Sequence, residues 1–184
     1  LFERHSRSIG AMGVDTWRRL TGLRCAIVGC GRIGSHVAGI LGKLGATRFT
    51  LVDPDVVELD LLTESDLFTQ DDCGHTKVEA LAYRLNHGYP YGSVGDTKTD
   101  ARHILRAYRS IAGADILVSA VDNDAARLAC ALLSTTHCLV QLDVAAGIHR
   151  NDQGQRQMEG DVHLILPGDR CLLCCGGVCD YDRA

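Results

Sequence analysis

Short apolar runs alternate along the chain with stretches in which apolar residues recur at helical spacing. The runs are rich in β-branched residues, as is typical of strands buried on both faces of a parallel sheet. They lie at 24–29, 48–53, 116–118 and 138–142. Between the first two, helical spacing from Ile33 to Lys43 ends near Gly45, which predicts a βαβ unit.

Three further segments have helical periodicity. They span 74–86, 101–112 and Asn123 to about Leu133. Strands therefore alternate with helices, which predicts an α/β fold with a Rossmann-like, doubly wound and mostly parallel sheet flanked by helices.

The pattern changes after Gly147. Residues 149–160 are polar and are expected to form a loop, and 162–166 are expected to add an antiparallel strand. We expect one domain over 1–184, truncated at its C-terminal end. Its parts are an N-terminal arm and helix at 1–23, a core at 24–147, and the start of a further region at 148–184.

Composition limits the function classes. The 184 residues are 46% hydrophobic and 23% charged, with a formal net charge of -4. This balance gives no case for a general nucleic-acid or membrane-surface binder. No apolar run reaches the roughly 18–20 residues that cross a bilayer, and the first residues lack a signal-peptide pattern. A cytoplasmic protein is expected.

The turn after the first strand carries the most informative motif, Gly29-Cys30-Gly31-Arg32-Ile33-Gly34. Its glycines permit a tight turn, close approach of a phosphate, and packing of the helix on the sheet. The helix N-terminus supplies donors to the anion. Asp53 follows 19 residues after Gly34, where a carboxylate can accept ribose hydroxyls. Arg32 could contact phosphate or remain a solvated residue.

Two more charged residues fit a nucleotide site. Asp55, on the long loop after the second strand, is expected to bind the nucleotide with its magnesium, and Lys77 lies in the first helical turn after that loop. A cation there gains nothing from the helix dipole, so a phosphate is one explanation and a solvated lysine the other. Asp122 follows the third strand, where it could serve Mg²⁺ or cap a helix; Asn123 or Asp124 could provide the cap equally well.

The chain resembles the ThiF/MoeB family of ubiquitin-activating-type adenylating enzymes. The motifs that carry the resemblance occur in the family's order and spacing. They are Arg4-His5-Ser6-Arg7, Gly29-x-Gly31-x-x-Gly34, Val52-Asp53-Pro54-Asp55-x-Val57-Glu58, Gly74-x-x-Lys77, Asp122-Asn123-x-x-x-Arg127 and Cys171-x-x-Cys174.

This resemblance implies ATP- and Mg²⁺-dependent adenylation of a C-terminal glycine. The substrate would be a ubiquitin-like or sulfur-carrier protein ending in Gly-Gly, and the enzyme a homodimer. By the same resemblance Asp53 would bind ribose, Lys77 phosphate, and Asp122 the metal and phosphates. Arg7 would reach the nucleotide of a partner subunit. Cys171 and Cys174 would provide half of a structural zinc site. The domain over 1–184 would be an adenylation domain, with its nucleotide-binding core at 24–147 and the start of its substrate and zinc region at 148–184.

The chain departs from the family at three positions. Leu61 stands at the family's asparagine, Glu64 at its arginine, and Arg32 at the second consecutive glycine of the turn. A carboxylate cannot replace a guanidinium at triphosphate. Either Arg32 supplies the missing positive charge, or the chain is a non-catalytic half that supports an active partner.

The cysteine cluster leaves the zinc ligands open. A tetrahedral site usually takes four ligands, and only one Cys-x-x-Cys pair is present. Either a second pair lies beyond the terminus, or Cys179 joins the pair with His163 or Cys175. A redox-active Cys-x-x-Cys lacks its usual strand-then-helix setting.

Two other functions use the same turn. An NAD-dependent oxidoreductase would need a catalytic His or Lys after the third strand, where Val121-Asp122-Asn123 stands. A scaffold subunit would keep the fold without turnover, and the residues at 61 and 64 favour it.

Overall fold

The computed structural model describes residues 3–88, 107–151 and 153–178. In chain order the elements are α1 (Ser6–Met12), α2 (Val14–Gly22), β1 (Arg24–Val28), α3 (Arg32–Leu44), β2 (Arg48–Val52), the 3-10 turns η1 (Asp60–Thr63) and η2 (Gln70–Asp72), α4 (Lys77–Gly88), α5 (Tyr108–Ala112), β3 (Ile116–Ser119), α6 (Asp124–His137), β4 (Val140–Arg150) and β5 (Arg156–Ile165).

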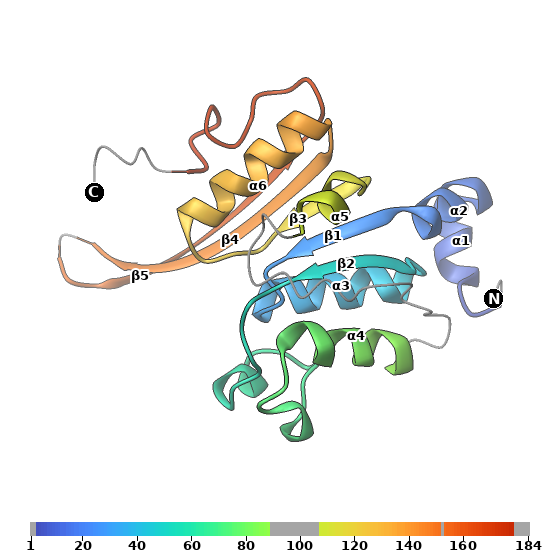
Figure 1. Ribbon diagram of the computed structural model, residues 1–184, viewed down its shortest axis with the longest axis horizontal. Helices are drawn as coiled ribbons and strands as arrows, with labels where there is room; N and C mark the ends of the chain where they lie inside the picture. The colour runs from blue at the N-terminus through green and yellow to red at the C-terminus, as the bar shows by residue number, and fades with distance from the viewer. Residues whose placement is uncertain (1–2, 89–106, 152, 179–184) are drawn as a thin grey trace.

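The strands form a five-stranded sheet in the order β2-β1-β3-β4-β5. The first four are parallel, and β5 pairs antiparallel with β4. Figure 1 shows α6 on one face of the sheet and α3 and α4 on the other. The predicted doubly wound α/β fold is therefore confirmed.

Alternate residues of the strands supply two separate cores. Cys25 and Ile27 of β1 pack on the face covered by α3 and α4. Ala26 and Val28 pack on the opposite face, with Ile111 of α5 and apolar residues of α6. Because β1 is covered on both faces, its sequence is continuously apolar, which is the signal that identified it.

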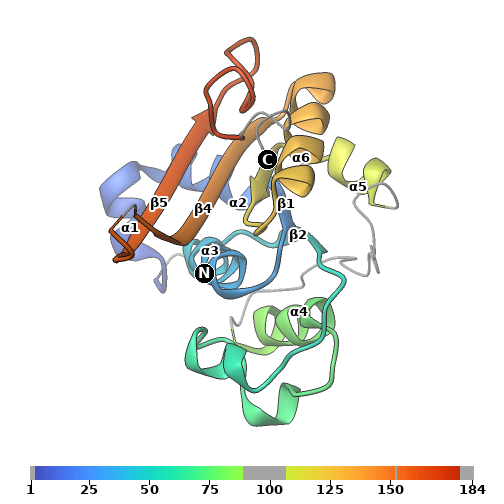
Figure 2. The same cartoon turned by 90° about the vertical axis from the view of Figure 1, so that its left-hand side faces the viewer.

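The expected loop over 149–160 is wrong in large part. Residues up to Arg150 belong to β4, and those from Arg156 belong to β5, with Arg150 and Arg156 paired in register. The two strands lie side by side in Figure 2, and their far ends extend beyond α6 in Figure 1. Nearly all of β5 is exposed. Apolar residues alternate along it at Met158, Val162 and Leu164, but all three are exposed, so backbone pairing maintains this part without a buried face.

The hairpin turn explains the polar sequence there. Asn151 accepts backbone hydrogen bonds from Gln153 and Gln155 on its side-chain oxygen, at 3.1 Å and 2.9 Å. Gly154 adopts a positive φ of 76°, which glycine does without steric cost. The antiparallel strand expected over 162–166 is confirmed but begins at Arg156.

Two other predictions agree only in part. Of the helix expected over 101–112, the described residues show α5 (Tyr108–Ala112), and 101–106 lie outside them. Two helices, α1 and α2, precede β1 where an arm and one helix were expected. Within the described residues no helix is both long and apolar enough to span a bilayer.

Candidate functional site

The glycine turn joins β1 to α3 at the carboxyl end of the sheet. Gly29 has φ +89°, and a Cβ there would lie 2.3 Å from the carbonyl oxygen of Ala120. A Cβ on Gly34 would lie 1.8 Å from the carbonyl oxygen of Gly29. A Cβ on Gly31, by contrast, would meet nothing within 4 Å. Packing therefore explains Gly29 and Gly34, whereas open space lies beside Gly31.

The first turn of α3 is open to an anion. Gly31 is its N-cap, and no side chain caps this helix end in the described part of the chain. The first turn contains no acidic residue. Its backbone N–H groups, together with the partial positive charge of the helix terminus, are thus available to a phosphate.

Asp53 connects the end of β2 to the glycine turn. Its carboxylate accepts the N–H of Cys30 at 2.7 Å and the N–H of Asp55 at 2.9 Å. The residue is only 8% exposed, and this burial raises the pKa of Asp53 although both hydrogen bonds act in the opposite direction. Each carboxylate oxygen accepts one of these two hydrogen bonds and keeps a lone pair for a ribose hydroxyl.

Lys77 lies at the start of α4, where its backbone is hydrogen-bonded to that of Asp55. Its ammonium group donates to a carboxylate oxygen of Asp55 at 2.9 Å. Burial acts to lower the pKa of Lys77, but the Asp55 hydrogen bond and the charges of Asp53 and Asp55 outweigh it, so the pKa is raised. The turn, Asp53, Asp55 and Lys77 form one connected group.

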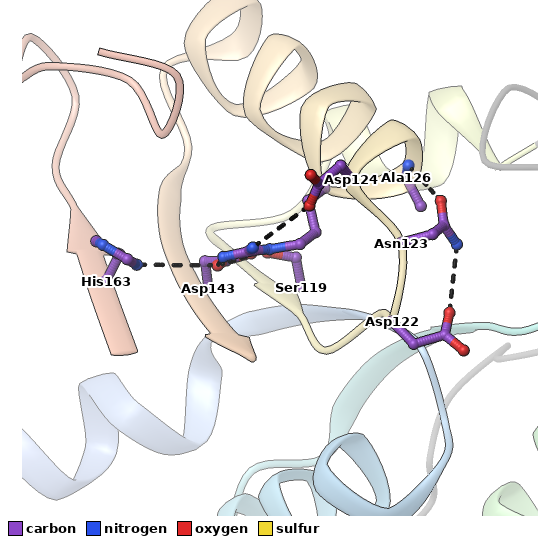
Figure 3. Close-up of polar contacts among 8 residues, drawn as sticks. Ser119, Asp122, Asn123, Asp124, Ala126, Asp143 and His163 are labelled. Carbon is purple, nitrogen blue, oxygen red and sulfur yellow. Dashed lines mark hydrogen bonds and ion pairs between the residues drawn. The ribbon is translucent and has the colours of Figure 1, made fainter. Parts of the chain in front are cut away.

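Asp122 lies at the neighbouring strand end, just before α6. Asn123 caps that helix, because its side-chain oxygen accepts the N–H of Ala126 at 2.9 Å. The Asn123 amide also donates to Asp122 at 3.3 Å (Figure 3). Capping therefore does not require Asp122, and its exposed carboxylate remains available to a ligand.

A pocket of about 240 Å³ adjoins Asp122 between α6 and the β4–β5 hairpin. Four carboxylates line it together with one arginine and the hairpin backbone; its lining comprises Val121, Asp122, Asp124, Arg127, Ala145, Ala146, Gly147, Ile148, Glu159 and Asp161. Its charge is strongly negative, so it suits a cationic or neutral group better than a phosphate.

A buried ion pair beneath this pocket was missed by sequence reasoning. Asp143 of β4 is fully buried and accepts hydrogen bonds from Arg127 and Ser119, each at 2.5 Å. The bond to Asp143 raises the pKa of Arg127. Figure 3 shows Asp143 with Ser119 on one side and His163 on the other. The Nδ1 atom of His163 lies 4.0 Å from a carboxylate oxygen of Asp143. An aspartate within a buried strand pattern was the available signal, because such a charge needs a partner.

The remaining predicted residues lie apart from this group. Arg7 is exposed on α1, near the amino end of β1, whereas the glycine turn follows the carboxyl end (Figure 1). Arg32 is exposed in the first turn of α3. Leu61 is 8% exposed and belongs to the core, while Glu64 is exposed.

The loop with these departures packs against α3. Ser65 and Ser35 share a hydrogen bond of 2.8 Å between their hydroxyls, and both are buried. This contact holds the loop beside the first turn of α3, the turn that carries Arg32.

Cys171 and Cys174 lie together at the C-terminal end of the described chain. Their sulfurs are 3.5 Å apart, and hydrogen bonds from Cys174 lower the pKa of Cys171. Two adjacent thiols fit half of a tetrahedral zinc site. No group of three or more metal-ligating side chains occurs among the described residues, and Cys179 lies outside them.

Comparison with known proteins gives consistent results. A model of the ThiF family matches residues 3–180. Ubiquitin-like modifier-activating enzyme 5 of Drosophila persimilis is 29% identical over 174 residues, which cover 88% of this chain and 43% of that protein. SAMP-activating enzyme E1 of Haloferax volcanii is 27% identical over 176 residues, 94% of this chain and 61% of that protein. The chain thus spans about half the length of these relatives.

Two solved structures of MccB are also similar to the chain. E. coli MccB with MccA-N7isoASN has a TM-score of 0.71 and 26% identity, and the match covers 96% of this chain and 52% of MccB. MccB with AMPCPP and MccA has a TM-score of 0.66 at 26% identity, over 91% and 50% of the two chains.

Proposed function

Because the chain belongs to the ThiF family, we propose that it binds ATP at the glycine turn and adenylates the C-terminal carboxylate of a small protein or peptide. The observation that carries the proposal is the connected group of the turn, Asp53 and Lys77 at one end of the sheet. Relatives named as activating enzymes for ubiquitin-like proteins favour a ubiquitin-like or sulfur-carrier substrate ending in Gly-Gly.

The geometry suits ATP in three ways. The uncapped N-terminus of α3 receives a phosphate beside Gly31. Asp53 accepts the ribose hydroxyls on its remaining lone pairs. Lys77 faces the same region with a protonated ammonium group. MccB, solved with AMPCPP, has a related fold.

The reaction needs positioning and positive charge more than proton transfer. A carboxylate oxygen of the substrate attacks the α-phosphorus, the bond from that phosphorus to the bridging oxygen breaks, and pyrophosphate leaves with the electron pair. An acyl-adenylate remains. No proton moves, so no general base is required, and donors fixed around the phosphates stabilise the developing charge.

Mg²⁺ would neutralise the phosphates and orient the leaving group. Asp122 is the residue we assign to it, because its exposed carboxylate is a ligand that Mg²⁺ accepts and does not cap α6. Arg7 would act in the site of a partner subunit of a homodimer, since α1 lies far from the chain's own turn. Cys171 and Cys174 would supply two ligands to a structural zinc ion.

Exchange of labelled pyrophosphate into ATP tests the proposal. We expect exchange only when a protein ending in Gly-Gly is present, and none when its terminal glycines are deleted. Binding of ATP without exchange in the presence of any such protein would favour the second candidate, a scaffold subunit, which Leu61 and Glu64 support. The NAD-dependent alternative has no comparable support.

A further inference from the structure

The loop between β2 and α4 closes on itself beside the glycine turn. The backbone N–H of Lys77 donates to the carbonyl of Asp55 at 2.9 Å. Val57 donates to His75 at 2.8 Å, and Gly74 donates to Val57 at 2.9 Å. These backbone hydrogen bonds therefore place Asp55 and Lys77 opposite each other, independently of the contact between their side chains.

The side-chain pair is unequally exposed. The Lys77 side chain is 17% exposed, whereas that of Asp55 is 64% exposed. An ion pair with one partner this exposed adds little to stability. Lys77 also begins α4, where the helix dipole disfavours a cation. Stability alone thus gives a weak reason for this pair.

We propose that Asp55 is a positioning residue, which holds the ammonium group of Lys77 beside the glycine turn for contact with phosphate. The proposal rests on the proposed function only in naming phosphate as the ligand of Lys77. An ammonium group has three donors, and Asp55 uses one of them. Asp55 is itself fixed, because its N–H donates to Asp53, which also accepts the N–H of Cys30. That Asp55 itself binds nucleotide stays a prediction beside this role.

The positioning role of Asp55 has a measurable consequence, because its charge affects the pKa of Lys77. Burial acts to lower the pKa of Lys77, and the carboxylate charges of Asp53 and Asp55 act to raise it. Replacing Asp55 by asparagine removes one of these charges and weakens the hydrogen bond. We expect the pKa of Lys77 to fall, although the lysine stays protonated near neutral pH.

Competitive acetylation tests the pairing without any nucleotide. Trace acetic anhydride at pH 9–10 labels only unprotonated lysines, and mass spectrometry of the peptide that contains Lys77 gives its reactivity. We expect Asp55→Asn to raise that reactivity about threefold or more, because a lower pKa leaves more of the lysine unprotonated at this pH. Asp55→Glu should restore low reactivity, and Asp66→Asn, at an exposed acid on the same loop, should change nothing. Equal reactivity in Asp55→Asn and the unchanged protein would overturn the pairing.

Pyrophosphate exchange then tests the positioning. Because Lys77 keeps its charge in Asp55→Asn, we expect the KM for ATP to rise less than in Lys77→Ala, while kcat falls about tenfold. The alkaline limb of the pH profile should move to lower pH. An unchanged kcat together with an unmoved alkaline limb would contradict positioning. If the unchanged protein shows no exchange but the acetylation result holds, the proposed function fails and the pairing stands.

Discussion

Two glycines of the turn are expected to have different roles, Gly34 in folding and Gly31 in ATP binding. Gly34→Ala would place a Cβ against the Gly29 carbonyl, a backbone atom that cannot move cheaply, whereas Gly31→Ala would place it in open space. We therefore expect Gly34→Ala to lower the melting temperature strongly or prevent folding. Gly31→Ala should keep the melting temperature within about 2 °C and weaken ATP binding, because the added methyl group occupies the position of a phosphate.

Thermal melts and ATP titrations of the two variants check this contrast. A Gly31→Ala protein that binds ATP as tightly as the unchanged protein would show that phosphate does not approach the turn. A stable Gly34→Ala protein would show that α3 can move away from β1.

Arg32 is the second residue whose role can be decided alone. It replaces a glycine of the family's turn, and Glu64 stands where the family has an arginine. Since the Ser35–Ser65 contact holds the two segments together, we expect Arg32→Ala to weaken ATP binding about tenfold. Lys43→Ala, which removes an exposed cation at the other end of α3, is the matched control. If Arg32→Ala leaves both ATP affinity and pyrophosphate exchange unchanged, the compensation hypothesis fails.

At the scale of elements, the buried pair of Arg127 and Asp143 joins α6 to β4. Asp143→Ala leaves a buried guanidinium without its main partner, so we expect a loss of about 3–5 kcal/mol in the free energy of unfolding. The double variant Arg127→Met, Asp143→Leu leaves no charge and should lose less. Urea denaturation measures both. A single variant within about 1 kcal/mol of the unchanged protein would show that water or another group satisfies Arg127.

Elements buried on both faces were predictable, and the exposed hairpin was not. Buried apolar residues follow a regular pattern in the strands β1 to β3 and in the helices α3, α4 and α6, and this pattern is visible in the sequence. The outer part of β4 and β5 buries no such core: Arg156 to Glu159 are exposed and are held by backbone pairing. Polar composition there indicated a loop, although the backbone was paired.

The candidate site could likewise be predicted only in part from the sequence. Asp53 and Lys77 were predictable because the ends of parallel strands and the starts of helices can be located in the sequence, and these ends meet at one edge of the sheet. The pairing of Lys77 with Asp55 was not, because it depends on how the intervening loop folds back. Asp143 was missed for a related reason, since its partner lies 16 residues away on another element.

At the scale of the whole molecule, Arg7 predicts shared sites between two copies of the chain. We expect Arg7→Ala and Lys77→Ala each to lose pyrophosphate exchange. In a mixed dimer both defects fall in one site and the other site is intact. Unfolding and refolding the two variants together should therefore restore about a quarter of the activity. If the refolded mixture contains dimers but recovers no activity, Arg7 does not serve a partner's site. If the chain exchanges pyrophosphate as a monomer, the shared site is excluded.

The claim on which everything else depends is that ATP binds at the glycine turn beside Asp53 and Lys77. Calorimetric titration with ATP and Mg²⁺, and separately with NAD⁺, measures this directly on the chain without any partner. We expect ATP to bind at one site per chain, Lys77→Ala to weaken that binding at least about tenfold, and NAD⁺ to bind more weakly than ATP. Tighter binding of NAD⁺, or ATP binding that Lys77→Ala leaves unchanged, would contradict it.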